Sequence, residues 1–272
     1  MNALRIFYAS IVAAALILAV SVGYVISQTS GSETSPAATE QGAVSDDSTG
    51  ATQQLVRDYL VSNPEVIEEA LMALQNKRVE EARSQQSETI TRMQDQLFNS
   101  KNQVVLGNPD GAVTLVEFFD YNCGYCRRAY PDMMALIDNN PDLKMVLKEF
   151  PILSEGSVQA ARIAVAVDVV APDRYSDFHR EMMTRGGQAD RAKALDVVRD
   201  LNLDVAAIEA KAGESSVDEN LAEVQSLARA LDISGTPSYI IADEAVPGAV
   251  GFDQLQQKVS AARKCGGNTL SC

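Results

Sequence analysis

The feature that most constrains the fold is a mostly apolar segment that runs directly into a Cys-x-x-Cys motif. Residues 113–121 are rich in β-branched and aromatic side chains, which predicts a strand covered on both faces. Residues 127–139, after the motif, are predicted to form a helix. Cys123 is therefore expected at the corner where the strand ends and the helix begins.

A cysteine at a helix amino terminus is well placed for thiol chemistry. Unpaired backbone N–H groups and the helix macrodipole favour a thiolate there. Cys126 follows Cys123 by three residues on the same helical face, where it is expected to be less exposed and close enough to form a disulfide with it. We expect Cys123 to attack a substrate sulfur and Cys126 to resolve the mixed disulfide.

Two other uses of the motif fit the chain less well. A zinc site needs two more ligands, and Cys265 and Cys272 are too far apart for a second close pair, which leaves His179 as the only histidine. An inert structural disulfide would not need a corner between a strand and a helix. The motif therefore predicts a redox site with no metal and no cofactor.

The charge balance excludes one class of partner. The chain has 37 acidic and 23 basic side chains, a formal net charge of −14. It has no basic field that could hold a polyphosphate backbone by counterion release. We expect no nucleic-acid partner.

Glu117 is an acidic residue in the middle of the predicted strand. It shares the alternation class of Leu115 and Phe119, so it is expected to face the core, although a surface position is the alternative. Burial of a carboxylate is costly, which makes a buried Glu117 a candidate for catalysis. Lys148, in the predicted strand 143–150, is a candidate partner that would keep Glu117 charged or exchange protons with it.

Two prolines mark further positions. Pro131 falls inside the predicted helix, where it removes one backbone hydrogen bond and is expected to kink the helix. Pro237 follows Thr236 and directly precedes the apolar segment 238–241. A cis bond between Thr236 and Pro237 would turn the backbone toward another loop.

Together these residues resemble the thioredoxin superfamily, and within it the exported DsbA-like branch. The strand with Glu117, the Cys123-Gly124-Tyr125-Cys126 motif and Pro131 are similar to the strand, buried acid, redox motif and kinking proline of that family. Thr236-Pro237 is similar to its cis-proline loop, which lies against the active-site sulfurs. The resemblance covers residues 103–264. It implies that Gly124, Tyr125, Thr236 and Pro237 contact protein substrates.

The resemblance also implies an architecture. Helical patterns at 158–170, 174–184, 191–201 and 217–231, all within 154–231, look like the insertion that separates the DsbA branch from plain thioredoxin. The implied architecture is an α/β thioredoxin fold with a helical insertion. The segment near Asn63-Pro64 resembles the amino-terminal extensions of ScsC-like and Com-type envelope proteins, some of which oligomerise through that region.

The amino-terminal segment predicts the compartment. Residues 6–26 are 21 positions without a charge, long enough to cross a bilayer as a helix. We expect an uncleaved anchor or a signal peptide, with a slight preference for the anchor because the run is long for a signal peptide. Arg5 lies before the run and no further basic residue occurs until Arg57, which places the rest of the chain outside the cytoplasm, in the periplasm.

The next two segments connect this helix to the compact domain. Residues 28–50 contain almost no large apolar side chains, which predicts a flexible acidic tether. Asn63-Pro64 is typical of a helix start, and the thin apolar stripe that follows allows two interpretations. One is a self-associating helical stalk over residues 51–100, and the other is a helix laid across its own catalytic domain.

These patterns divide the chain into successive parts. We expect a signal peptide or anchor at 1–27, a linker at 28–50, a helical extension at 51–100, a DsbA-like domain at 101–265 with an insertion at 154–231, and a tail at 266–272. In the tail region, Cys265 and Cys272 either form a disulfide in an oxidising compartment or remain free or intermolecularly paired.

The predicted function is an envelope thiol-disulfide oxidoreductase. Its partners are expected to be cysteine-containing protein substrates and a redox partner protein, expected in the membrane. The strongly oxidising DsbA proteins carry Pro-His between the cysteines, whereas Gly124-Tyr125 and Thr236 resemble DsbC-type isomerases, so oxidase, isomerase and reductase all stay open. The alternative is a non-enzymatic holdase or metal-binding adaptor built on the same fold.

Overall fold

The computed structural model describes residues 46–272. The predicted apolar run at 6–26, and most of the predicted linker, lie outside these residues. Within 46–272, no helix is both long enough and apolar enough to cross a membrane. The chain divides into two units, Met1–Ile67 and Glu68–Cys272, and we describe each by itself.

The described part of the first unit is helical. Helix α2 spans Asp46–Ser62, and α3, Glu65–Arg92, begins directly after Asn63-Pro64 as predicted. Residues 46–50, which the sequence assigned to the linker, belong to α2.

In the second unit, the end of α3 packs against the compact domain. Ile90 and Leu97, the latter in the short helix α4 (Gln94–Phe98), are buried in one cluster with Leu227 of α10 (Ser215–Ala230). The side chain of Gln86 also donates a hydrogen bond to the backbone oxygen of Leu231. Of the two interpretations, these contacts fit a helix laid across its own domain at this end of α3.

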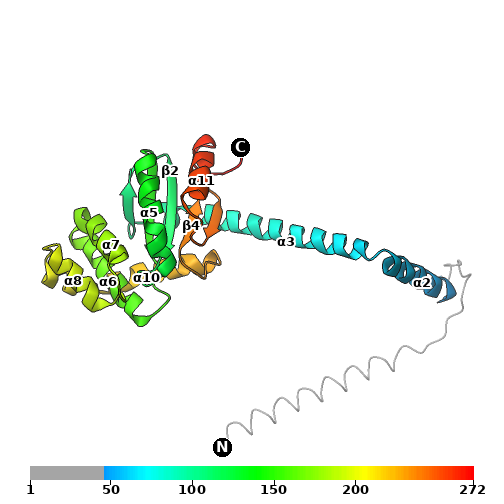
Figure 1. The fold of residues 1–272 in the computed structure, drawn as a ribbon, viewed down its shortest axis with the longest axis horizontal. Helices are drawn as coiled ribbons and strands as arrows, with labels where there is room; N and C mark the ends of the chain where they lie inside the picture. The colour runs from blue at the N-terminus through cyan, green and yellow to red at the C-terminus, as the bar shows by residue number, and fades with distance from the viewer. Residues whose placement is uncertain (1–45) are drawn as a thin grey trace, which may run out of the picture. The chain divides into compact units, whose positions relative to one another are not determined.

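A five-stranded mixed sheet forms the centre of the second unit (Figure 1). Its order is β1-β3-β2-β4-β5; β2 and β3 are parallel, and the other neighbouring strands are antiparallel. The strands are β1 Val104–Gly107, β2 Val113–Phe119, β3 Leu143–Glu149, β4 Ser238–Ile241 and β5 Glu244–Pro247. The three inner strands, β3, β2 and β4, are the ones predicted from their apolar sequence.

Helices cover both faces of the sheet, as expected for strands that are apolar on both sides. One face of β2, with Leu115 and Phe119, shares a core cluster with residues of α5 (Gly124–Asn139) and α11 (Phe252–Lys264). The other face, with Val116 and Phe118, shares a second cluster with α4 and α10. This layered arrangement agrees with the predicted α/β fold class.

Between β3 and β4 the chain forms five α-helices. They are α6 Glu155–Val170, α7 Tyr175–Thr184, α8 Arg191–Asp200, α9 Val205–Ala212 and α10, with a 3-10 turn at Pro172–Arg174. The sequence patterns predicted all of these except α9. That helix is short, and it begins at Asp204, whose side chain accepts a hydrogen bond from the backbone N–H of Ala207.

The carboxyl-terminal tail is fixed by a disulfide between Cys265 and Cys272. Within the tail, the backbone N–H of Leu270 and the hydroxyl of Thr269 donate hydrogen bonds to Asp243, and Leu270 packs against the main core. Of the two alternatives for these cysteines, the structure has the intramolecular disulfide.

Replacing both Cys265 and Cys272 with serine is expected to lower the free energy of unfolding by about 2 kcal/mol, because the unfolded chain is released from a small closed loop. Urea denaturation of the oxidised protein measures this change. Ser271→Ala keeps the disulfide and is the matched control. A loss below about 0.5 kcal/mol, the range of ordinary surface substitutions, would contradict a stabilising role for this loop.

Candidate active site

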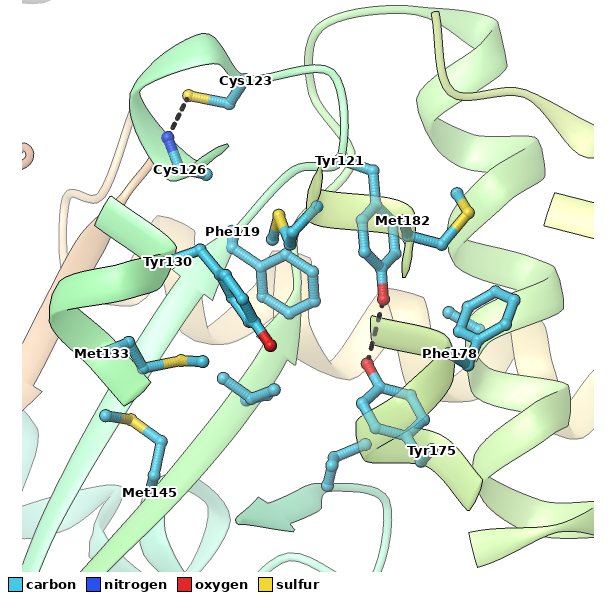
Figure 2. Packing of buried hydrophobic residues seen from close by; sticks show 14 of the residues in the cluster. Phe119, Tyr121, Cys123, Cys126, Tyr130, Met133, Met145, Tyr175, Phe178 and Met182 are labelled. Atoms are coloured by element: carbon cyan, nitrogen blue, oxygen red, sulfur yellow. Dashed lines mark hydrogen bonds between the residues drawn. The ribbon is translucent and has the colours of Figure 1, made fainter. Parts of the chain in front are cut away.

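Cys123 is the N-cap residue of α5 and lies in the turn between β2 and that helix. Its backbone is extended (φ −76°, ψ 113°), and it caps the helix because its Sγ accepts a hydrogen bond from the backbone N–H of Cys126 at 3.4 Å. Figure 2 shows this contact at the start of α5, at the edge of the main core. The sulfur therefore lies at the amino-terminal end of a 16-residue helix.

A second loop, far away in the sequence, lies beside the same sulfur. The peptide bond between Thr236 and Pro237 is cis, and the backbone oxygen of Thr236 accepts a hydrogen bond from Cys123 Sγ at 3.1 Å. The structure thus brings together the motif and the proline loop that the sequence analysis assigned to one site.

The four residues of the motif differ in exposure. Cys123 and Cys126 are free thiols and are 5% and 1% exposed. Gly124 and Tyr125 face solvent; Tyr125 is 61% exposed, and the Arg128 guanidinium lies 4.2 Å from the centre of its ring. A substrate can therefore meet Tyr125 and the edge of Cys123, whereas Cys126 is covered.

Cys126 is held in its protonated form. Burial raises the pKa of the Cys126 thiol well above its ordinary value, and the nearby Glu117 carboxylate raises it further. A thiol attacks a disulfide only as the thiolate. Cys126 therefore needs a proton acceptor before it can act as a resolving nucleophile.

Glu117 lies on β2, on the core face, and is 3% exposed. Its cross-strand neighbour on β4 is Tyr239, whose hydroxyl donates a hydrogen bond to the carboxyl group. Burial raises the pKa of Glu117 from 4.5 to about 8, and the Tyr239 hydrogen bond offsets part of that rise. The predicted burial is confirmed, and the carboxyl group is close enough to Cys126 to change its pKa.

The predicted pairing of Lys148 with Glu117 is wrong. In the parallel register of β2 and β3, Glu117 lies beside Leu147, whereas Lys148 lies beside Phe118 on the opposite face of the sheet. The Lys148 ammonium donates hydrogen bonds to the backbone oxygen of Gln96 and to the side chain of Gln103. Burial lowers the pKa of Lys148 to about 8. Because its ammonium contacts α4 and not Glu117, Lys148 is part of the packing around α4 and lies outside the redox site.

Replacing Lys148 with methionine is expected to leave the rate of disulfide exchange within about twofold of wild type, because the lysine and the cysteines lie on different faces of the sheet. The measurement is the rate of reduction of a protein disulfide by the reduced variant. A roughly tenfold slower rate in a variant with wild-type stability would contradict this placement and indicate that Lys148 acts in the redox site.

A buried polar cluster that no sequence pattern indicated lies under the active site. The Tyr121 hydroxyl lies 3.0 Å from His179 Nδ1 and 3.3 Å from the Tyr175 hydroxyl, which donates to Glu149 (Figure 2 labels the two tyrosines). Burial lowers the pKa of His179 to about 3, so the ring is neutral. Within residues 46–272, no group of three or more His, Cys, Asp and Glu side chains is arranged to hold a metal.

The match to known families covers most of the described chain. Residues 114–260 match the DsbA-like thioredoxin domain, and residues 51–81 match the copper resistance protein ScsC N-terminal domain. The curated disulfide bond formation protein D of Bacillus subtilis is 27% identical over 172 residues, which cover 58% of this chain and 76% of that protein.

Solved structures give the same result. A thioredoxin-like oxidoreductase from Silicibacter pomeroyi DSS-3 is 43% identical, with a TM-score of 0.60 over 62% of this chain and 97% of that chain. A linker-deleted mutant of Proteus mirabilis ScsC is 29% identical, with a TM-score of 0.62 over 83% of this chain and all of that chain. Because the matched domain spans more than half of the sequence, this chain belongs to the DsbA-like thioredoxin domain family of thiol-disulfide oxidoreductases.

Proposed function

We propose that the chain exchanges disulfides with protein substrates through Cys123 and Cys126. The observation that carries this proposal is the position of the Cys123 sulfur, which caps a helix, borders solvent and lies beside the Thr236 backbone. An extended substrate strand could pair with the Thr236-Pro237 loop through its main chain, which suits many sequences. Gly124, Tyr125, Thr236 and Pro237 would form the contact surface.

The proposed chemistry has two steps. The Cys123 thiolate attacks one sulfur of a substrate disulfide, forms a mixed disulfide and releases the other substrate sulfur as a thiolate. Cys126 then loses its proton and attacks Cys123 Sγ, which forms the Cys123–Cys126 disulfide and releases the reduced substrate. In the opposite direction the same steps oxidise a substrate dithiol. Glu117 is the proposed acceptor of the Cys126 proton, because it is buried beside that thiol.

Among oxidation, reduction and isomerisation of substrate disulfides, we favour isomerisation of incorrect disulfides. The Gly124-Tyr125 dipeptide and Thr236 are similar to isomerase-type relatives, and the dipeptide supplies no cation beside the sulfur that would make a strong oxidant. Oxidation of substrates is the second candidate. For net oxidation or reduction, the Cys123–Cys126 pair would be recycled by a membrane-bound redox partner.

The amino-terminal helices support a proposal of self-association. Large apolar side chains are more than half exposed along α2 and the first half of α3, namely Leu55, Val56, Tyr59, Val61, Leu71 and Met72. Exposed apolar surface of this extent is typical of interaction sites. We propose that residues 51–100 contribute to a homo-oligomer that brings several Cys123 sites to one substrate. Sedimentation equilibrium of the full chain beside a chain lacking residues 46–67 measures this.

We further propose a periplasmic location. The uncharged run at 6–26, with Arg5 before it, would export the chain and anchor it to the inner membrane or be cleaved as a signal peptide. Fractionation of cells, followed by carbonate extraction of membranes, distinguishes an anchored from a released protein.

Refolding of a scrambled disulfide protein tests the proposed function. The reduced chain, in catalytic amount and without added oxidant, is expected to restore substrate activity. The chain would be assigned as an oxidase if substrate activity returned only from the reduced dithiol and only with an external oxidant. A protein without exchange in either assay, but able to suppress aggregation of the substrate, would be the non-enzymatic holdase or adaptor.

A further inference from the structure

The residue before the active-site cysteine makes an unusual set of contacts. Asn122 pairs with the backbone of Ala189 in both directions: its Oδ1 accepts from the Ala189 N–H at 2.6 Å, and its Nδ2 donates to the Ala189 oxygen at 2.8 Å. Nδ2 also lies within hydrogen-bond distance of the Ser157 and Ser154 hydroxyls, at 3.0 and 3.3 Å. All three partners belong to the helical segment between β3 and β4.

The backbone around Asn122 is fixed as well. Its N–H donates to Asp120 Oδ1 at 2.8 Å, and the Cys123 N–H donates to the Asp120 backbone oxygen at 2.9 Å. The second carboxylate oxygen of Asp120, which is 1% exposed, accepts from the backbone N–H groups of Ile152 and Leu153. Asp120 therefore holds the main chain of the redox turn, whereas the Asn122 side chain ties that turn to the insertion.

The insertion is shaped to receive this side chain. Ser154 caps α6 by accepting from the Ser157 N–H, which places both hydroxyls at one helix end. Ala189 approaches that end so closely that a Cβ on Gly156 would lie 2.8 Å from the Ala189 oxygen. Glycine at position 156 thus permits the backbone approach that presents Ala189 to Asn122.

We propose that Asn122 is a positioning residue through which the helical insertion sets the location of the Cys123 sulfur, and that it stabilises the disulfide form more than the reduced form. In the reduced form, only weak contacts hold the sulfur near the Cys126 N–H and the Thr236 oxygen. In the disulfide form, the covalent bond to Cys126 fixes it. A turn that Asn122 already holds loses less conformational freedom when this bond closes, so the Asn122 contacts favour the disulfide form.

This inference rests on the proposed redox chemistry at Cys123 and Cys126, and its test is an equilibrium measured within one protein. The oxidised chain is equilibrated with reduced and oxidised glutathione, and the fraction with the Cys123–Cys126 disulfide is measured by acid quenching and alkylation. Asn122→Ala is expected to shift the equilibrium constant toward the reduced form by about five- to tenfold. A wild-type chain that forms no such disulfide would overturn the proposed function itself and not only the role of Asn122.

Matched variants separate positioning from plain stability. Asn140 is also a buried asparagine with side-chain hydrogen bonds, but it lies at the other end of α5. Asn140→Ala is expected to lower the melting temperatures of both redox forms equally and to leave the glutathione equilibrium within about twofold of wild type. Equal melting losses and an unchanged equilibrium in Asn122→Ala would overturn the proposal.

A second substitution tests the same contact from the other side. Gly156→Ala forces the Ala189 oxygen away from α6 and should shift the equilibrium in the same direction as Asn122→Ala, without any change to the redox turn. If Asn122→Ala does not fold, Gly156→Ala decides the question, and a shift below about twofold would then reject the proposal.

Discussion

Replacing Cys123 with alanine is expected to reduce the rate of disulfide exchange with a protein substrate by roughly 10³-fold or more, because no other free thiol in residues 46–272 borders the solvent. Cys126 is buried and its pKa is raised, so it cannot take over the first attack. The measurement is the turnover of a protein disulfide followed by thiol alkylation.

The companion variant, Cys126→Ala, is expected to give a different result. It keeps the attacking sulfur but loses the resolving one, so mixed disulfides between Cys123 and substrate should accumulate and survive non-reducing electrophoresis. A variant with both Cys265 and Cys272 changed to serine is the control and should retain exchange, because that disulfide is outside the site. Full activity in the Cys123→Ala variant would disprove the proposed mechanism.

The part of the fold that could be predicted from the sequence is the part with strong local patterns. The strand 113–121 and the motif after it placed Cys123 at the corner between β2 and α5. Apolar periodicity located four of the five α-helices between β3 and β4. The strands β1, β4 and β5 have four residues each, and of these only β4 was predicted, because Pro237 directly before it marked the position. The contact between Cys123 and Thr236 was predictable only through the family resemblance.

The errors at the site have a common cause. The sequence shows which residues alternate along one strand but not the register between two strands, and a shift of one residue moves a side chain to the other face. Lys148 was therefore assigned to Glu117, although it lies beside Phe118. The contacts of Asn122 were missed for a related reason, since Ala189 is 67 residues away in the sequence. Ala189 also binds through its backbone, and any residue type could supply those backbone groups.

Glu117→Gln is expected to change the pH dependence of stability. Glutamate titrates near 4.5 when unfolded, whereas burial raises the pKa of Glu117 to about 8 in the folded chain. Between these values the unfolded chain loses a proton that the folded chain keeps, so wild-type stability falls as the pH rises. Glutamine is neutral at every pH and removes this effect. The stability of the variant relative to wild type should therefore increase by about 3 kcal/mol between pH 4.5 and pH 7.

The same substitution should slow resolution of the mixed disulfide by roughly 10²-fold, because an amide cannot accept the Cys126 proton. In wild type this step should speed up with pH and level off near pH 8, where Glu117 is ionised. In Glu117→Gln the step should be slower and should keep rising with pH without levelling off there, because only the thiolate fraction of Cys126 then sets its rate. Stopped-flow release of a fluorescent peptide from Cys123 measures it. Glu149→Gln is the matched control, since burial also raises the pKa of Glu149, but its hydrogen-bond partners are Tyr175 and Tyr121. Equal pH profiles for wild type and Glu117→Gln would remove Glu117 from the mechanism and leave water as the proton acceptor.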